Sequence, residues 1–186
     1  MNRKWVCMLF IGLLGLQAHA QQAASGALAE ANAANKEMLL KGGKISPRQQ
    51  RELKLAEKAE SNQQTTQTYL AANKLKTGVM TLPSGVQYKI LKAGTGKKVG
   101  DAPTVRCLYQ GTLVDGTRFD NELGKTAIEM KVDGFVPGLK EAVKLMPVGS
   151  KWEIVVPPQL GYGARGNHAV APNAVLIYEM EITGTL

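Results

Sequence analysis

Histidine and cysteine, which often serve as general bases, nucleophiles and metal ligands, are rare in this chain. Histidine occurs at His19 and His168, and cysteine at Cys7 and Cys107. His168 lies beside Asn167 in a loop-like stretch, and no Gly-x-Ser-x-Gly motif presents a serine to it. A metal site needs several closely spaced ligands of these types. The sequence therefore predicts neither a catalytic triad nor a metal site.

The glycine-rich stretch 161–166 matches Gly-x-Gly-x-x-Gly, the pattern of a dinucleotide-binding loop. In that motif a helix follows at once, and its N-terminus receives the pyrophosphate. Here Ala171-Pro172-Asn173 follows, and then a segment that alternates as a strand does. We therefore expect no cofactor, and a tight loop that holds Tyr162 at the rim of a cavity.

Aromatic rings and one carboxylate are the informative side chains between Tyr109 and Tyr178. Phe119-Asp120 places a carboxylate beside a ring at the end of a strand. Core packing is the simpler explanation for any single ring. It is less satisfactory for Tyr109, Tyr162 and Tyr178 together, because each buried hydroxyl needs a partner. An apolar pocket with a few convergent polar groups is typical of a small-ligand site.

Short strands separated by turns must position these side chains. Asp115-Gly116 is a hairpin signal, and residues 138–145 predict one short helix that ends before Pro147. The strand pattern predicts six strands, at residues 86–91, 104–114, 118–120, 127–132, 151–156 and 175–183. Together they predict an α+β domain over residues 81–186, with a curled antiparallel sheet over one short helix.

A long helical segment, residues 21–80, is expected before this domain. Residues 21–43 are alanine-rich and end at Gly42-Gly43. Ser46 and Gln49 form a capping box around Pro47, so a second helix is expected from there to about Lys76. Its apolar stripe is thin, which indicates a connector. Dimerisation through this segment and simple tethering both remain open.

Residues 1–20 have the pattern of a secretory signal peptide. A short basic start precedes an apolar run, and Ala18-His19-Ala20 is an A-x-A cleavage site. A membrane anchor is the alternative, but the run is shorter than the roughly 20 residues that a span needs. We expect an exported protein that starts at Gln21, most simply in the periplasm; the outer membrane and the exterior remain open.

The net charge and the cysteine content limit the kinds of partner that we expect. The formal charge of +8 becomes +6 once Arg3 and Lys4 are removed. The lysines are dispersed and no nucleic-acid-binding motif is present, so we expect no nucleic-acid partner. Of the two cysteines only Cys107 survives cleavage. It lies in phase with the inward-facing Val105, which favours a buried, inert thiol over an intermolecular disulfide.

A series of short motifs occurs in order along residues 82–186. The motifs are Leu82-Pro83-Ser84-Gly85, Tyr109-x-Gly111, Asp115-Gly116-x-x-Phe119-Asp120, Phe135-Val136-Pro137-Gly138, Glu141-Ala142-Val143, Met146-x-Val148-Gly149, Gly161-Tyr162-Gly163 and Leu176-Ile177-Tyr178. In this order they resemble the FKBP-type peptidyl-prolyl cis–trans isomerase domain. The signal peptide and helical segment before it are similar to the exported bacterial proteins of the macrophage-infectivity-potentiator and FkpA type, which are typically dimers.

The resemblance implies a role for each of nine residues. Asp120 would face the twisting amide, and Tyr162 would donate its hydroxyl at the rim. The backbone N–H of Val136 would meet a substrate carbonyl. The walls and floor of the cavity would be Tyr109, Phe119, Ile128, Phe135, Val136, Leu139 and Tyr178.

The implied activity needs no reagent, because prolyl isomerisation breaks no covalent bond and only rotates an amide over its barrier. One departure from the family pattern is Leu139, at the position where a tryptophan usually forms the cavity floor. We expect reduced but real isomerase activity on proline-containing or unfolded polypeptides. The alternative is a non-enzymatic chaperone or binding module with a degraded pocket.

Overall fold

The computed structural model describes residues 30–120 and 126–186. The chain forms two compact units, residues 1–57 and 58–186, and their boundary falls inside helix α2 (Pro47–Asn73). The predicted signal peptide lies outside the described residues. The expected domain limits, 21–80 and 81–186, remain predictions.

In the first unit, residues 30–40 are helical and the turn after them contains Gly42 with φ of 78°. The capping box at the start of α2 is confirmed. Ser46 N–H donates to Gln49 Oε1 at 2.9 Å, and Gln49 N–H donates to Ser46 Oγ at 3.3 Å. The side chains of Ile45 and Leu53 are buried in this unit.

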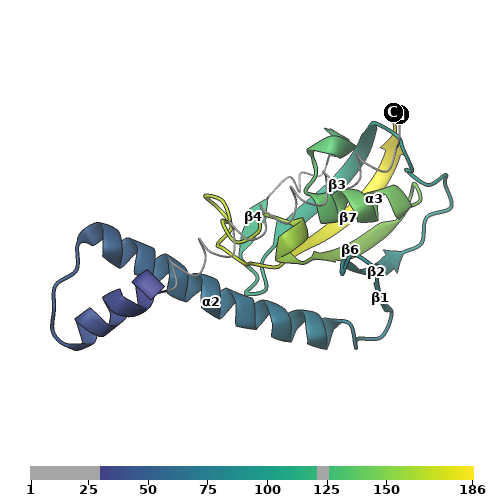
Figure 1. Cartoon of the computed structure of the whole chain (residues 1–186). Helices are drawn as coiled ribbons and strands as arrows, with labels where there is room; N and C mark the ends of the chain where they lie inside the picture. The colour runs from purple at the N-terminus through teal and green to yellow at the C-terminus, as the bar shows by residue number, and fades with distance from the viewer. Residues whose placement is uncertain (1–29, 121–125) are drawn as a thin grey trace, which may run out of the picture. The chain divides into compact units, whose positions relative to one another are not determined.

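The second unit contains a seven-stranded sheet in which every pairing is antiparallel. Its order is β1-β2-β6-β7-β3-β4 (Figure 1). Strand β5 pairs with β3 off this path. The strands are β1 (Val79–Thr81), β2 (Gln87–Lys92), β3 (Thr104–Thr112), β4 (Arg118–Asp120), β5 (Ile128–Lys131), β6 (Lys151–Val156) and β7 (Leu176–Thr185).

The core lies between this sheet and one short helix. Helix α3 (Pro137–Leu145) contacts β6 (Figure 1). Its Leu139, Ala142 and Val143 side chains are buried in the core. Its apolar positions recur at helical spacing, so one face is apolar. Short 3₁₀ turns at Val132–Gly134 and Pro158–Leu160 precede α3 and follow β6. The predicted α+β class, with a sheet curled over one helix, is confirmed.

The last part of α2 belongs to the second unit and is joined to β2. Asn73 Nδ2 donates to Gln87 Oε1 at 2.9 Å, and Gln87 Nε2 donates to the Leu70 carbonyl at 2.9 Å. Asn73 and Gln87 are both buried. Helix α2 ends at Asn73, three residues before the expected end near Lys76.

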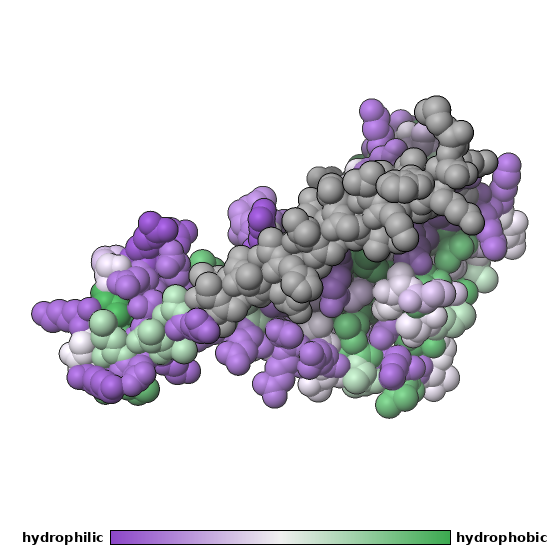
Figure 2. Space-filling view, in the orientation of Figure 1, coloured by the Kyte–Doolittle hydropathy of each residue, from purple (hydrophilic) through white to green (hydrophobic). Residues whose placement is uncertain are grey.

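Two other observations concern β1 and Cys107. Strand β1 was not predicted from the sequence; it pairs with β2 across the turn that contains Gly85, φ 94°. Cys107 is fully buried, and burial raises the pKa of its thiol to about 11, as the prediction of an inert thiol requires. Figure 2 shows hydrophilic residues dispersed over the visible face formed by described residues, rather than gathered in one patch.

Candidate functional site

A tyrosine and a carboxylate from neighbouring strands form the polar centre of the candidate site. Tyr109 on β3 donates its hydroxyl proton to Oδ1 of Asp120, the last residue of β4, at 3.1 Å. The pairing of Gly111 with Asp120 brings the two strands into register at this point. Tyr109 is buried, whereas Asp120 is partly exposed. The carboxylate is therefore held by the sheet and still reaches solvent.

The rings of Phe119 and Tyr178 pack beside this centre. The ring of Phe119 meets the ring of Tyr178 edge-on, with centroids 5.5 Å apart and planes at 83°. The Tyr109 and Tyr178 rings lie 6.5 Å apart at 47°. Edge-to-face and tilted arrangements are the favourable ones for aromatic pairs. β3 and β7 bring Tyr109 and Tyr178 together because Gly111 lies opposite Tyr178 in the ladder.

Gly111 has a role that was not predicted from the sequence. A Cβ atom at this position would lie 2.7 Å from Phe119 Cζ and 3.0 Å from Asp120 Cβ. Only glycine lets the Phe119 ring lie directly against β3. A glycine inside a long predicted strand is itself a signal for this role, because it weakens the strand and often marks the close approach of another group.

Tyr162 joins the cluster from the loop after the second 3₁₀ turn. Burial raises the pKa of its hydroxyl, and the negative charge of Asp120 raises it further. Burial also raises the pKa of Tyr178 well above its ordinary value, with smaller contributions from Tyr162, Asp120 and Tyr109. Both hydroxyls therefore remain protonated at neutral pH and are available as hydrogen-bond donors.

The remaining predicted residues belong to the hydrophobic core of the second unit. Phe135 and Leu139 are buried, with 8% and 2% of their surface exposed. Ile128 and Val136 are partly exposed and pack against the same core. Eight of the nine predicted residues thus belong to this hydrophobic core, and Asp120 is joined to it by its hydrogen bond from Tyr109. Their roles in binding and catalysis stay predictions.

Trp152 is buried and stacks on Tyr88 with ring centroids 4.5 Å apart and planes at 11°. The glycine-rich loop is a series of turns, with Gly163 and Gly166 at φ of 64° and 62°. It is followed by irregular chain and then by β7. The geometry of a dinucleotide-binding loop is therefore not present here.

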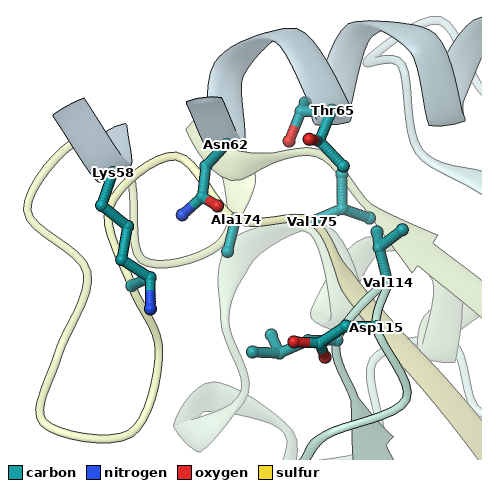
Figure 3. Close-up of a pocket in the computed structure, with 10 residues that line it drawn as sticks. Lys58, Asn62, Thr65, Val114, Asp115, Ala174 and Val175 are labelled. Carbon is teal, nitrogen blue, oxygen red and sulfur yellow. The ribbon is translucent and has the colours of Figure 1, made fainter. Parts of the chain in front are cut away.

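A hollow lies between the middle of α2, the β3–β4 turn and the chain before β7 (Figure 3). It encloses about 270 Å³. Its lining residues are Lys58, Asn62, Thr65, Thr66, Leu113, Val114, Asp115, Ala171, Ala174 and Val175. This hollow was not predicted from the sequence, because the segments that line it are far apart along the chain.

Within residues 30–120 and 126–186, no histidine, cysteine and carboxylate side chains are grouped as a metal ion would need. The same part of the chain has no helix that is both long and apolar enough to cross a membrane.

Comparison with known proteins identifies two matching family models. Residues 95–183 match the FKBP-type peptidyl-prolyl cis-trans isomerase, and residues 12–90 match the domain amino terminal to FKBP-type peptidyl-prolyl isomerase. The outer membrane protein MIP of Legionella longbeachae is 47% identical over 128 residues, which cover 67% of this chain and 54% of that protein. The chain spans about half the length of such relatives.

Two solved structures are also similar. A peptidyl-prolyl cis-trans isomerase from Pseudomonas syringae is 31% identical with a TM-score of 0.61, and the match covers 75% of this chain and 96% of that one. FkpA from Escherichia coli is 27% identical with a TM-score of 0.68, and the match covers 92% of this chain and 93% of that one.

Proposed function

Because this chain belongs to the FKBP-type peptidyl-prolyl cis–trans isomerase family, we propose that it accelerates rotation about X–Pro bonds in polypeptide substrates. The observation that supports this proposal best is the cluster in which Asp120 accepts a hydrogen bond from Tyr109 and the ring of Phe119 packs edge-on against Tyr178. The negative charge of Asp120 also raises the pKa of the Tyr162 hydroxyl. Such a site offers rings and hydrogen-bond donors without an acid–base pair. Amide rotation requires no more than that.

The physical basis is the difference between a planar and a twisted amide. The planar amide is stabilised by conjugation and its carbonyl is polar, and the barrier to rotation is about 18–20 kcal/mol. The twisted amide has lost conjugation and is less charge-separated. An apolar surface therefore disfavours the ground state relative to the transition state. Each tenfold acceleration corresponds to about 1.4 kcal/mol of such preference.

In this proposal each group of residues has one task. The rings of Phe119 and Tyr178 receive the prolyl ring. Tyr162 donates its hydroxyl to a substrate carbonyl, and the backbone N–H of Val136 donates to a second one. Asp120, held by Tyr109, faces the rotating amide. Ile128, Phe135 and Leu139 complete the apolar surface.

Leu139 gives the alternative function its support. It stands where the resemblance implies a tryptophan, and a leucine offers the prolyl ring less flat surface. A binding module that shields unfolded chains without isomerising them would tolerate this change. An isomerase would keep activity with weaker substrate binding, which is the outcome we propose.

The test is isomerisation of a series of short peptides that differ in the residue before proline. Purified protein should raise the rate above that in buffer, and Tyr162→Phe and Asp120→Ala should each lower kcat/KM by about tenfold or more, the effect of one lost transition-state hydrogen bond. Tyr69→Phe and Asp101→Ala are matched controls, since both side chains lie outside the cluster. Suppression of aggregation with no gain in rate would favour the binding module.

Export and self-association complete the proposal. The pattern of residues 1–20 supports export, most simply to the periplasm. A homodimer through the N-terminal helices is supported by exposed apolar side chains there, since Met38, Leu39 and Leu40 expose 50%, 40% and 81% of their surface. Sedimentation tests this: the protein should sediment as a dimer, and Met38→Glu/Leu40→Glu as a monomer. A monomeric parent protein would contradict the dimer.

A further inference from the structure

Helix α2 is hydrogen-bonded to the chain segment that precedes β7. Asn62 Nδ2 donates to the Pro172 carbonyl at 2.7 Å, and Thr66 Oγ1 donates to the Asn173 carbonyl at 2.8 Å. These donors lie one helical turn apart, so they project from the same face of α2. Figure 3 shows Asn62 extending from α2 on the side of the hollow where Ala174 lies. Two consecutive carbonyls of an irregular segment are therefore held by one helix face.

Asn173 connects this contact to the glycine-rich loop. Its side chain donates back to the Ala59 carbonyl of α2 at 3.2 Å, and its backbone N–H donates to the Gly163 carbonyl at 3.0 Å. Asn173 has φ of 56°, and it is the only non-glycine residue with positive φ in the part of the chain that the structure describes. Asparagine tolerates this left-handed conformation better than most residues. The residue thus joins helix and loop through both its backbone and its amide.

The loop that Asn173 holds is the one that carries Tyr162. Gly163, the acceptor, is the next residue along the chain. The loop is also fixed internally, because Gly166 N–H donates to the Tyr162 carbonyl at 3.2 Å and Gly163 N–H to the Pro158 carbonyl at 2.8 Å. A shift of the segment at Asn173 would therefore move the Tyr162 backbone. Thr66 is buried, which protects its hydrogen bond from competition with water.

We propose that Asn62, Thr66 and Asn173 are positioning residues that place the Tyr162 hydroxyl in the candidate site. This inference rests on the proposed function for its catalytic consequence. It assigns part of the activity to a helix that supplies no residue to the cluster. Small errors in the position of a catalytic donor lower rates strongly. The hydrogen bonds that Asn62, Thr66 and Asn173 make between α2 and the segment before β7, called the latch below, therefore influence turnover.

The variant Thr66→Val tests the latch, because it keeps the shape of the side chain and removes the donor. Thr65→Val is the matched control: Thr65 is exposed, and its hydroxyl donates to the Ser61 carbonyl within α2. Amide hydrogen exchange at Asn173 should become about fivefold faster in Thr66→Val, the effect of one lost hydrogen bond. It should change less than about twofold in Thr65→Val.

This exchange measurement does not depend on activity. Acceleration confined to residues 161–175, with the amides of β7 unchanged, supports the latch. Equal exchange in wild type and Thr66→Val overturns it. If Thr66→Val fails to fold, Asn173→Asp replaces it, because aspartate also tolerates the positive φ and lacks the amide donor to the Ala59 carbonyl. Its loop should exchange faster in the same way.

A double-mutant cycle on kcat/KM then tests whether the latch acts through Tyr162. Thr66→Val should lower kcat/KM about fivefold in the wild-type background and leave it unchanged in a Tyr162→Phe background. An equal loss in both backgrounds overturns the positioning role. A wild-type protein that has no isomerase activity contradicts the proposed function, while hydrogen exchange still decides whether α2 holds the loop.

Discussion

The hydroxyl of Tyr109 is 3.1 Å from Oδ1 of Asp120, and this bond joins β3 to β4 at the candidate site. Its loss in Tyr109→Phe leaves a partly exposed carboxylate free to rotate toward solvent. We expect kcat/KM for a proline peptide to fall about three- to tenfold, the effect of roughly 1 kcal/mol. The melting temperature should fall by only a few degrees. An unchanged rate would mean that the orientation of Asp120 is irrelevant to the reaction.

Gly111 is predicted to be necessary for the position of Phe119. In Gly111→Ala the new methyl would lie 2.7 Å from Phe119 Cζ, so the ring must move away from β3. We expect a loss of about 1–3 kcal/mol of stability, as for other overpacked sites, together with a lower kcat/KM. Denaturant titration and the peptide assay measure the two effects.

Gly134→Ala is the control for this substitution. Gly134 does not have a positive φ, and a methyl group added there would have no atom within 4 Å, so the stability and rate of the variant should match wild type. Equal behaviour of the Gly111 and Gly134 variants would show that the strand accommodates a side chain beside Phe119.

Leu139 is predicted to be a packing residue as well as part of the apolar surface, since 2% of it is exposed. Leu139→Ala should lower the free energy of unfolding by about 2–5 kcal/mol, through lost burial and the cavity left behind. Leu139→Met conserves volume and should cost less than about 1.5 kcal/mol. Denaturant titration at one pH compares the two. Similar losses would show that volume at this position does not control stability.

Most of this fold could be predicted from the sequence because its signals are local. The capping box at Ser46 and the turn glycine Gly116, φ 82°, depend on neighbouring residues alone, and both were predicted. β1 was missed because three residues are too few to show alternation, and it exists by pairing with β2. The end of α2 was misplaced because Asn73 is fixed by Gln87, which lies beyond the helix on β2.

In the candidate site, too, residues that belong to local sequence motifs were predicted, and residues that act through distant contacts were not. Rings and the carboxylate of Asp120 were recognised as motifs. The contributions of Asn62, Thr66 and Asn173 were not, because each depends on a hydrogen bond between residues more than 100 positions apart. Sequence patterns of short period carry no information on such pairs.

The thiol of Cys107 is predicted to make stability fall at alkaline pH. Burial raises its pKa from 9.0 to about 11 in the folded protein. Between about pH 9 and 11 the folded state therefore retains a proton that the unfolded state has lost. Ionisation of the thiol does not affect the free energy of unfolding below about pH 9 and lowers it between pH 9 and 11. The loss attributable to this thiol is roughly 2–3 kcal/mol.

Cys107→Ala isolates the thiol in this experiment, because Tyr162 and Tyr178 titrate in both proteins. The variant is less stable at pH 7, owing to lost packing, but its free energy of unfolding should decrease less between about pH 9 and 11. Chemical denaturation at each pH measures the difference. Parallel pH profiles for the two proteins would contradict the prediction.

The rate of X–Pro isomerisation by the wild-type protein, measured with one peptide from about pH 7 to 9, tests the proposed function most directly. The hydroxyls of Tyr162 and Tyr178 stay protonated over this range because their pKa values are raised. We expect a rate clearly above that in buffer and constant with pH, since no proton is transferred. A rate equal to that in buffer at every pH would contradict the proposal.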